Sequence, residues 1–291
     1  MIKKNFFIAE VSSNHNANLE RCLHFIDIAK KIGCDAVKFQ LFRIDQLFHR
    51  SILKKRKDIK LRKKWELPIN FLKKISDHCK KKKILFGCTP FYLDAVDQLY
   101  PYVDFFKIAS YELLWDDLFI KCIKKKKPII FSTGMASKNE IQNKIKLFRK
   151  YKFENYSILH CVSSYPAPLK SVNLNSINFL RKLTKNKIKI GWSDHTKNSG
   201  VIYKAIFDHK AQIIEFHIDL DKKGREFKFN HCWLPNEMGA IINIIKKDKI
   251  ISGKIGKVVS TSESIEKNWR ADKYDGLRPL KKIRKKYDKK F

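Results

Sequence analysis

The feature that most constrains this sequence is a regular alternation of short apolar runs with longer amphipathic runs, from residue 5 to about residue 250. Repeated pairs of a buried strand and an amphipathic helix are typical of α/β folds with a parallel sheet. Strands are expected at residues 6–11, 36–40, 84–89, 105–110, 128–134, 157–163, 189–195 and 213–219. Helices are expected at residues 19–32, 68–82, 92–100, 116–125, 138–150, 174–184, 200–210 and 235–247.

Eight strand–helix pairs in about 250 residues predict a (β/α)8 TIM barrel. A doubly wound open sheet is the alternative. Residues 43–66 form a long, charged excursion after the second strand, and loops in this position often shape the mouth of an active site. We expect a barrel at residues 1–250 and a short, basic, partly disordered C-terminal extension at residues 251–291.

Charge and cysteine content narrow the class of protein. The net charge is +34, but the lysines fall mainly at predicted helix ends, where solvated charge is ordinary, so we expect no nucleic-acid partner and no membrane partner. The seven cysteines are odd in number and include no C-x-x-C pair. No uncharged apolar run approaches the roughly 18 residues that a membrane span needs. A cytoplasmic protein with reduced thiols and no secretion signal is expected.

Polar side chains gather at the carboxyl ends of the predicted strands, which form the reactive face of a barrel. They are Glu10, Lys38, Gln40, Thr89, Lys107, Ser110, Ser132, Thr133, His160, Ser163, Ser193, His195, Glu215 and His217. Side chains two residues apart on a strand share a face, as Ser193 does with His195 and Glu215 with His217. We expect His160 to be structural, and Asp194 to cap the next helix or bond the loop backbone.

The lysines and histidines in this set indicate an anionic substrate and a metal ion. A buried lysine is costly unless an anion meets it, so Lys38 and Lys107 among hydroxyl side chains indicate a small substrate with phosphate and carboxylate groups. His195 and His217, on neighbouring strands, could together hold a divalent metal. Plainer interpretations stay open: Lys38 could extend to the barrel rim, and a lone histidine is more often a hydrogen-bonded structural residue. The turn at Gly134 is either a phosphate cradle or a tight turn.

Longer stretches of the chain carry a resemblance to a known family. In order, from residue 7 to about residue 240, they are IAEVSSNHNANLE, GCDAVKFQ, FGCTPF, FFKIAS, PIIFSTGMAS, LHCVSSYPAP, IGWSDHT and IIEFHIDLD. With these motifs the chain resembles the N-acetylneuraminate (sialic acid) synthase family. The resemblance implies a (β/α)8 barrel, and an enzyme that condenses phosphoenolpyruvate with an open-chain N-acetylated amino sugar such as N-acetylmannosamine. The implied products are a nine-carbon 2-keto acid and phosphate.

The resemblance also implies roles for individual residues. It assigns a divalent cation, manganese or magnesium, to His195 and His217. It assigns phosphoenolpyruvate to Lys38, Thr89, Lys107, Ser110, Ser163 and Ser193. Gln40, Glu112 and Tyr165 match positions that line the sugar or cation site. Glu10 and Glu226 are the expected proton-transfer residues, although Glu226 stands where the family usually has an aspartate.

The chain departs from the family pattern in three places. It ends at Phe291 without the family's C-terminal antifreeze-like domain, which in a typical dimer supplies an arginine to the partner's sugar site. Arg270 and Arg278 are candidates to replace that arginine, and a homodimer stays open. Ala17 stands in place of the glycine of the family's Asn-His-x-Gly motif. In the divergent segment FNHCWLP, His231 is either an added site residue or a loop histidine.

Two other functions stay open. One is condensation of phosphoenolpyruvate with a different aldose, because the usual C-terminal domain is missing. The other is a non-catalytic barrel with a binding role. The presence of both lysines, Lys38 and Lys107, and of both histidines, His195 and His217, argues against the second.

Overall fold

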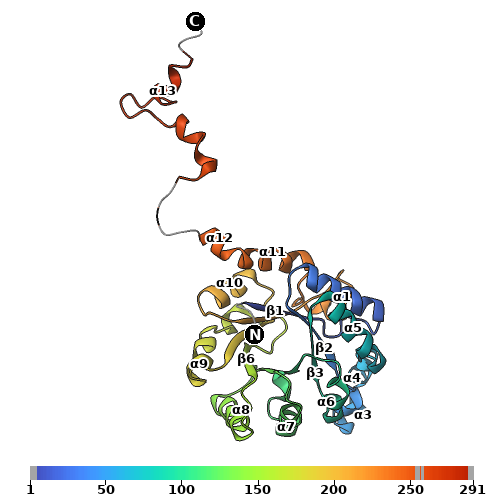
Figure 1. The fold of residues 1–291 in the computed structure, drawn as a ribbon. Helices are drawn as coiled ribbons and strands as arrows, with labels where there is room; N and C mark the ends of the chain where they lie inside the picture. The colour runs from blue at the N-terminus through green and yellow to red at the C-terminus, as the bar shows by residue number, and fades with distance from the viewer. Residues whose placement is uncertain (1–4, 253–255, 257–258, 288–291) are drawn as a thin grey trace. The chain divides into compact units, whose positions relative to one another are not determined.

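The barrel is closed and entirely parallel. The computed structural model describes residues 5–252, 256 and 259–287, and the chain divides into two compact units, Met1–Lys246 and Lys247–Phe291. In the first unit, eight strands pair in sequence order and the last pairs with the first, with helices around the outside (Figure 1). The predicted (β/α)8 barrel is therefore confirmed, and the doubly wound sheet is excluded.

The strands match the predicted runs closely at their start and less well at their end. They are β1 (Phe6–Glu10), β2 (Ala36–Leu41), β3 (Leu85–Pro90), β4 (Phe105–Ile108), β5 (Ile129–Ser132), β6 (Tyr156–Cys161), β7 (Lys189–Asp194) and β8 (Ile213–His217). Ser110, Ser163 and His195 lie just beyond their strands rather than within them. At Ser110 the cause is local, because the chain turns into the 3-10 helix η3 (Ser110–Glu112) and leaves the strand ladder.

The helices that cover the barrel fall where the apolar periodicity predicts them. They are α1 (Leu19–Lys31), α5 (Leu72–Lys82), α6 (Leu93–Leu99), α7 (Asp116–Lys124), α8 (Lys138–Lys150), α9 (Asn175–Leu183), α10 (Ser199–Phe207) and α11 (Pro235–Lys246). Helix α8 shows the local logic: Ser137 and Glu140 form a capping box at its start, and Ile141, Ile145 and Phe148 form its buried stripe.

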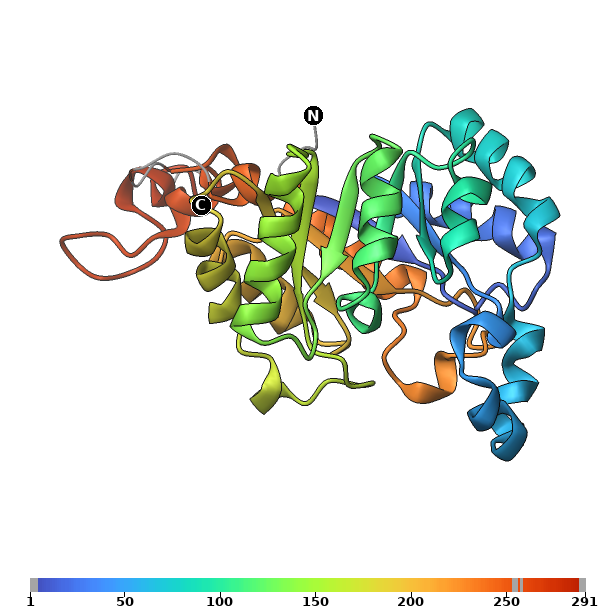
Figure 2. The ribbon, with the colours of Figure 1, turned by 90° about the horizontal axis from the view of Figure 1, so that it is seen from below.

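The charged excursion after β2 is folded rather than extended. It contains α2 (Ile44–Leu47), α3 (Arg50–Lys55), α4 (Lys57–Lys60) and the 3-10 helix η1 (Leu61–Trp65). Its two ends are joined, because the amide of Ile44 donates to Glu66 Oε1 at 2.8 Å. In Figure 2 this segment, drawn in blue, lies on the same side of the barrel as the orange loop that follows β8.

Side chains inside the barrel form an apolar layer with a polar layer next to it. The apolar layer is a cluster of Phe6, Ile8, Ala36, Phe105, Ile130, Leu159 and Ile213. Because alternate residues of a strand share a face, the next inward positions are Glu10, Lys38, Lys107, Ser132 and Glu215. Gly87 is required here, since a Cβ at this position would lie 2.2 Å from the ring of Phe105. The strands therefore bury their beginnings and present polar groups at their ends.

The second unit has short elements of its own. These are α12 (Asp248–Ser252), η6 (Thr261–Glu263), η7 (Glu266–Trp269) and α13 (Lys281–Arg284). Asp272 accepts hydrogen bonds from the amides of Tyr274 and Lys281, which fixes the turn between them. The partial disorder expected for residues 251–291 stays a prediction. Among the residues that the structure describes, no helix is both long enough and apolar enough to cross a membrane.

Candidate active site

A cavity of about 730 Å³ lies at the carboxyl ends of the strands. Every predicted site residue lines it except Thr89 and Ser163, namely Glu10, Lys38, Gln40, Lys107, Ser110, Glu112, Tyr165, Ser193, His195, His217 and Glu226. Thr89 lies one contact away, because its Oγ1 accepts a hydrogen bond from Lys38 Nζ at 3.1 Å. The structure thus brings together residues that are spread over more than 200 positions of the sequence.

The floor of the cavity is a buried network of two lysines and two carboxylates. Lys38 Nζ contacts Glu10 Oε2 and lies 3.8 Å from Glu215 Oε2. Lys107 Nζ lies 3.5 Å from Glu215 Oε1 and donates a 2.6 Å hydrogen bond to Ser132 Oγ. We expected a substrate anion to offset the charge of the two buried lysines. The chain itself already supplies counter-charges, the carboxyl groups of Glu10 and Glu215.

Glu215 is the site residue that sequence reasoning placed on the reactive face without giving it a role. Its position two residues before His217, on the same face of β8, was the available signal. Ser193 Oγ donates to Glu215 Oε1 at 2.8 Å. Glu215 therefore links the two lysines to the serine that was predicted to contact the anion.

The electrostatics of this network separate its two carboxyl groups. Burial raises the pKa of Glu10 to about 7, although Lys38 acts in the opposite direction. Burial would also raise the pKa of Glu215, but Lys107 and Lys38 outweigh it and hold that pKa at about 2. Burial lowers the pKa of Lys107, whereas Glu10 and Glu215 raise that of Lys38 despite its burial. Glu10 is thus the group of this network that can gain or lose a proton near neutral pH.

The hydroxyl groups above the floor surround Gly134. The Gly134 amide donates to Ser110 Oγ at 2.9 Å, and a Cβ on Gly134 would lie 2.2 Å from Ser163 Oγ. The turn is therefore tight, as one of the two interpretations of the sequence had it, and this amide is already engaged. Ser163 Oγ is buried without a hydrogen-bond partner, which leaves this hydroxyl for a ligand.

His195 and His217 lie side by side, as their strand positions predict. Their ring centroids are 5.3 Å apart, and the ring of Tyr165 lies 4.3 Å from that of His195. His195 Nδ1 lies 2.8 Å from the carbonyl oxygen of Val162, an arrangement that places the proton on Nδ1 and leaves Nε2 as an acceptor or ligand. Burial opposes protonation of His195, but Cys161 and the Val162 carbonyl raise its pKa to about 9, so Nε2 becomes an acceptor or ligand only when the ring gives up its second proton.

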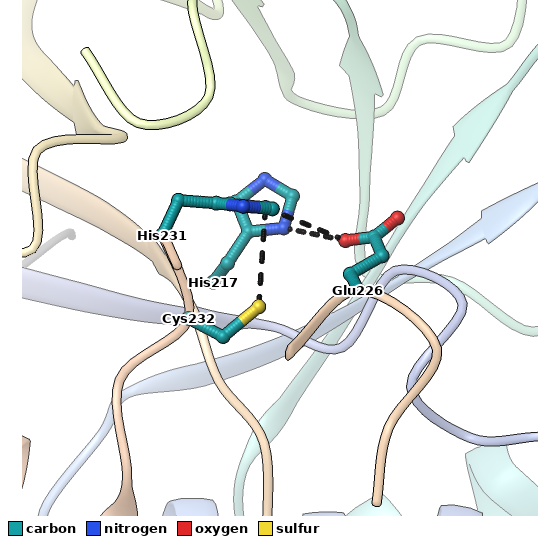
Figure 3. Close-up of side chains that lie close together, drawn as sticks. All are labelled: His217, Glu226, His231 and Cys232. Atoms are coloured by element: carbon teal, nitrogen blue, oxygen red, sulfur yellow. Dashed lines mark hydrogen bonds and ion pairs between the residues drawn. The ribbon is translucent and has the colours of Figure 1, made fainter. Parts of the chain in front are cut away.

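A second group of potential ligands meets at His217. Among the described residues, His217, Glu226, His231 and Cys232 place one ligand atom each within 4.8 Å of one another, and His195 is not part of this set (Figure 3). Glu226 Oε2 lies 3.1 Å from His217 Nδ1 and 3.6 Å from His231 Nε2. Burial lowers the pKa of His217 to about 4. Burial would raise the pKa of Glu226, but hydrogen bonds with His217 and His231 bring it below its ordinary value.

Imidazole nitrogens, a carboxylate oxygen and a thiol are all donors to divalent metals, so the residues present fit a cation. His231 is buried and faces Glu226, and of its two interpretations the structure supports a site residue over a loop histidine. Cys232 is a residue that sequence reasoning missed, since neighbouring loop residues carry no periodic signal.

Two further expectations concerned structural residues, and both are confirmed. Asp194 accepts hydrogen bonds from the amides of Thr196 and Lys197 in the loop after β7. It also accepts hydrogen bonds from the indole nitrogens of Trp192 and Trp233. His160 Nε2 lies 2.8 Å from the carbonyl oxygen of Val172. Both residues hold loops in place and stay out of the cavity lining.

The outer part of the cavity is largely aromatic. The lining residues of this part are Leu47, Phe48, Arg62, Trp65, Phe91, Tyr111 and Phe229. Four of them belong to the excursion at residues 43–66, in agreement with the prediction that this segment shapes the mouth.

Two further polar residues line the cavity. Gln40 donates to Glu10 Oε1 at 2.8 Å, and burial raises the pKa of Glu112 to about 7. A polar floor and an aromatic entrance suit a small anion together with a larger polar partner.

Known proteins similar to this chain include synthases of sialic-acid-type sugars. The sequence profile of the NeuB family matches residues 25–257. An N,N'-diacetyllegionaminic acid synthase of Campylobacter jejuni is 33% identical over 275 residues, which cover 90% of this chain and 81% of that protein. A pseudaminic acid synthase of the same species is 32% identical over 282 residues, which cover 91% and 79%.

A solved structure from the same kind of synthase is also similar to this chain. The N-acetylneuraminic acid (sialic acid) synthetase of Leptospira borgpetersenii, in complex with citrate, has a TM-score of 0.77 to this chain at 30% identity. The match covers 90% of this chain and 89% of that one. The resemblance seen in the sequence motifs is therefore confirmed, and this chain belongs to the NeuB family, with the sialic-acid-type synthases as its relatives.

Proposed function

We propose that this chain condenses phosphoenolpyruvate with an open-chain N-acetylated amino sugar, N-acetylmannosamine or a related sugar. The products are a nine-carbon 2-keto acid of the sialic-acid type and phosphate. Membership of the NeuB family supports the reaction class. The observation that carries the proposal is the convergence, in one cavity, of Lys38 and Lys107 with the carboxyl group of Glu10 and the imidazoles of His195 and His217.

The proposal includes a divalent cation, manganese or magnesium, at the histidines. His195 and His217 are its proposed ligands, with Glu226 beside them. When bound, such a cation supplies Lewis-acid polarisation of the sugar's aldehyde oxygen. The proposal also places the protein in the cytoplasm, which is in keeping with seven cysteines that form no disulfide.

The lysines and hydroxyl groups bind phosphoenolpyruvate in this proposal. Lys38 and Lys107 meet its phosphate and carboxylate, and Thr89, Ser110, Ser163 and Ser193 supply hydrogen bonds. Protonation of Glu10 leaves the charge of Lys38 available to the substrate, because the two side chains are in contact. Fixing both charged groups of the substrate presents one face of its enol carbon to the sugar.

Two protons move in the reaction. C3 of phosphoenolpyruvate forms a bond to the aldehyde carbon, and the aldehyde oxygen takes up a proton to become a hydroxyl group. Water adds to C2 and loses one proton, which balances the proton taken up by the aldehyde oxygen. The bond from C2 to the phosphate oxygen then breaks, the C2 hydroxyl group gives its remaining proton to the departing phosphate, and a keto group remains. Glu10, with a pKa of about 7, and Glu226 are the proposed groups for these transfers. Gln40, Glu112 and Tyr165 face the sugar.

The experiment is to measure phosphate release from phosphoenolpyruvate with manganese, across a panel of N-acetylated and plain aldoses. We expect release that depends on an N-acetylated amino sugar, and a fall of at least about 100-fold in Lys107→Met or His217→Ala. His24→Asn, an exposed histidine on α1, is the matched control and keeps full activity. Release with plain aldoses alone would favour the different-aldose reaction. A folded, metal-loaded protein that releases no phosphate with any sugar contradicts the proposal.

A further inference from the structure

We propose that His231 and Cys232 complete, together with His217 and Glu226, a four-donor site for a borderline-soft divalent cation such as zinc or cobalt. The cation of the proposed function lies at His195 and His217, with Glu226 beside them. In the four-donor site His217 stays a ligand, His195 is not among the donors, and His231 and Cys232, on the loop after β8, are new. The inference rests on the proposed function and replaces its manganese or magnesium with a cation that imidazole and thiolate donors prefer.

The donor atoms lie near one another, with a spacing somewhat wider than that of a coordination shell. His217 Nδ1 and Glu226 Oε2 are 3.1 Å apart, His231 Nε2 and Glu226 Oε2 are 3.6 Å apart, and His231 Nε2 and Cys232 Sγ are 3.9 Å apart. Metal bonds of roughly 2.0–2.1 Å to nitrogen or oxygen and about 2.3 Å to sulfur place tetrahedral neighbours about 3.3–3.6 Å from each other. All four donor atoms lie within 4.8 Å of one another, so a cation would draw the widest pairs closer by up to roughly 1 Å or a little more.

Burial supports a ligand at this point. The side chain of Cys232 is 1% exposed and that of His231 is 2% exposed. The ring nitrogen of His231 that faces Glu226 and Cys232 is Nε2, whereas the buried atom without a hydrogen-bond partner is Nδ1, on the other side of the ring. Figure 3 shows the rings of His217 and His231 and the Cys232 sulfur gathered beside Glu226.

Neighbouring residues hold the donors in place. The fully buried side chain of Asn14 donates to Cys232 Sγ at 3.4 Å and accepts from the amide of Glu226 at 2.8 Å. Ser12 Oγ donates to Glu226 Oε1 at 2.5 Å. One asparagine thus positions two of the four donors at once, which is the kind of support that ordered metal ligands receive.

The loop itself returns to the strand that carries His217. The amide of Trp233 donates to the carbonyl oxygen of His217 at 2.8 Å, and the amide of Asp219 donates to the carbonyl oxygen of Trp233 at 2.9 Å. These bonds bring Cys232, next to Trp233 in sequence, alongside the end of β8. The donor set is therefore built by backbone pairing as well as by side chains.

The chemistry of the set selects among cations. Two imidazoles, one carboxylate and one thiolate favour zinc, cobalt and iron(II), whereas magnesium prefers oxygen donors and water. We therefore expect zinc and cobalt to bind more tightly than magnesium, and zinc to displace cobalt.

The test is a cobalt titration of the full chain after removal of metals by a chelator, followed by absorption spectroscopy. The wild type is expected to bind one cobalt ion per chain with thiolate-to-cobalt charge-transfer absorption in the near ultraviolet. Cys232→Ser is expected to lose that absorption and still bind cobalt. His231→Asn is expected to weaken binding at least about 10-fold. Cys34→Ser, a buried thiol before the start of β2, and His24→Asn are the matched controls and keep the wild-type spectrum.

The outcomes separate this inference from the proposed function. A Cys232→Ser protein with the wild-type spectrum, or a folded His231→Asn protein with wild-type cobalt affinity, would overturn the inference even if sugar-dependent phosphate release is normal. Circular dichroism establishes that each variant is folded, and Cys232→Ser changes a single atom. Cobalt bound with the thiolate absorption, in a protein that releases no phosphate with any sugar, supports the site and contradicts the proposed function instead.

Discussion

At the scale of single residues, Glu112 couples the site to pH. Burial raises its pKa from the ordinary value of 4.5 to about 7. The folded state thus favours the protonated carboxyl, so its contribution to stability is complete below pH 4.5 and is lost as pH rises through about 7. Glu112→Gln keeps a neutral group at every pH and escapes this loss.

We predict that the free energy of unfolding of Glu112→Gln, relative to that of the wild type, rises by about 2 to 3 kcal/mol when the pH is raised from about 5 to about 8. Urea unfolding of both proteins at each pH gives the difference in free energy of unfolding between variant and wild type, and the other titrating groups cancel because both proteins share them. If this difference is the same at both pH values, Glu112 is ionised and hydrated in the folded protein.

At the scale of elements, the folded segment at residues 43–66 forms part of the wall of the cavity. Trp65 lines the cavity, and the guanidinium of Arg62 lies 5.2 Å from the centroid of its ring. An aromatic face of this kind suits the C–H face of a sugar rather than an anion. The segment belongs to the first unit, so the chain builds this wall from its own barrel.

We predict that Trp65→Ala raises the KM for the sugar about 10-fold, a loss of roughly 1.4 kcal/mol, with a smaller change in kcat. The KM for phosphoenolpyruvate is expected to stay unchanged, because its proposed contacts lie on the barrel floor. Steady-state kinetics with each substrate varied in turn measures both constants. Leu61→Ala, on the same segment and 64% exposed, is the control. A rise in the KM for phosphoenolpyruvate alone would contradict the assignment.

At this scale, local patterns in the sequence were enough to predict the strands and helices, but not the contacts between distant residues. Strands and covering helices followed from periodicities of 2 and 3.6, and polar strand ends identified ten of the residues that line the cavity. The pairing of Lys107 with Glu215 did not follow, because it depends on strand register and side-chain reach. Cys232 was also missed, because its place beside β8 depends on contacts that are distant in sequence. Asn14 donates to its sulfur, and the amide of the adjacent Trp233 donates to the carbonyl oxygen of His217.

At the scale of the whole molecule, the barrel and residues Lys247–Phe291 are separate compact units. We predict that a fragment of residues 1–252 folds cooperatively and unfolds thermally within about 4 °C of the full chain, because a barrel of this size has its own core. Differential scanning calorimetry of both proteins measures this. A much lower midpoint for the fragment would show that the second unit stabilises the barrel. The prediction that Arg270 or Arg278 reaches the sugar would fail if the fragment kept full activity.

The most direct test of the proposed reaction follows the carbon atom that forms the new bond. Phosphoenolpyruvate labelled with carbon-13 at C3 is incubated with the protein, the divalent cation and the active sugar, and the products are examined by NMR and mass spectrometry. The account predicts that the label appears in a methylene group of a nine-carbon 2-keto acid, in amounts equal to the phosphate released. Label in the methyl group of pyruvate, with phosphate release independent of the sugar, would show simple hydrolysis and contradict the account.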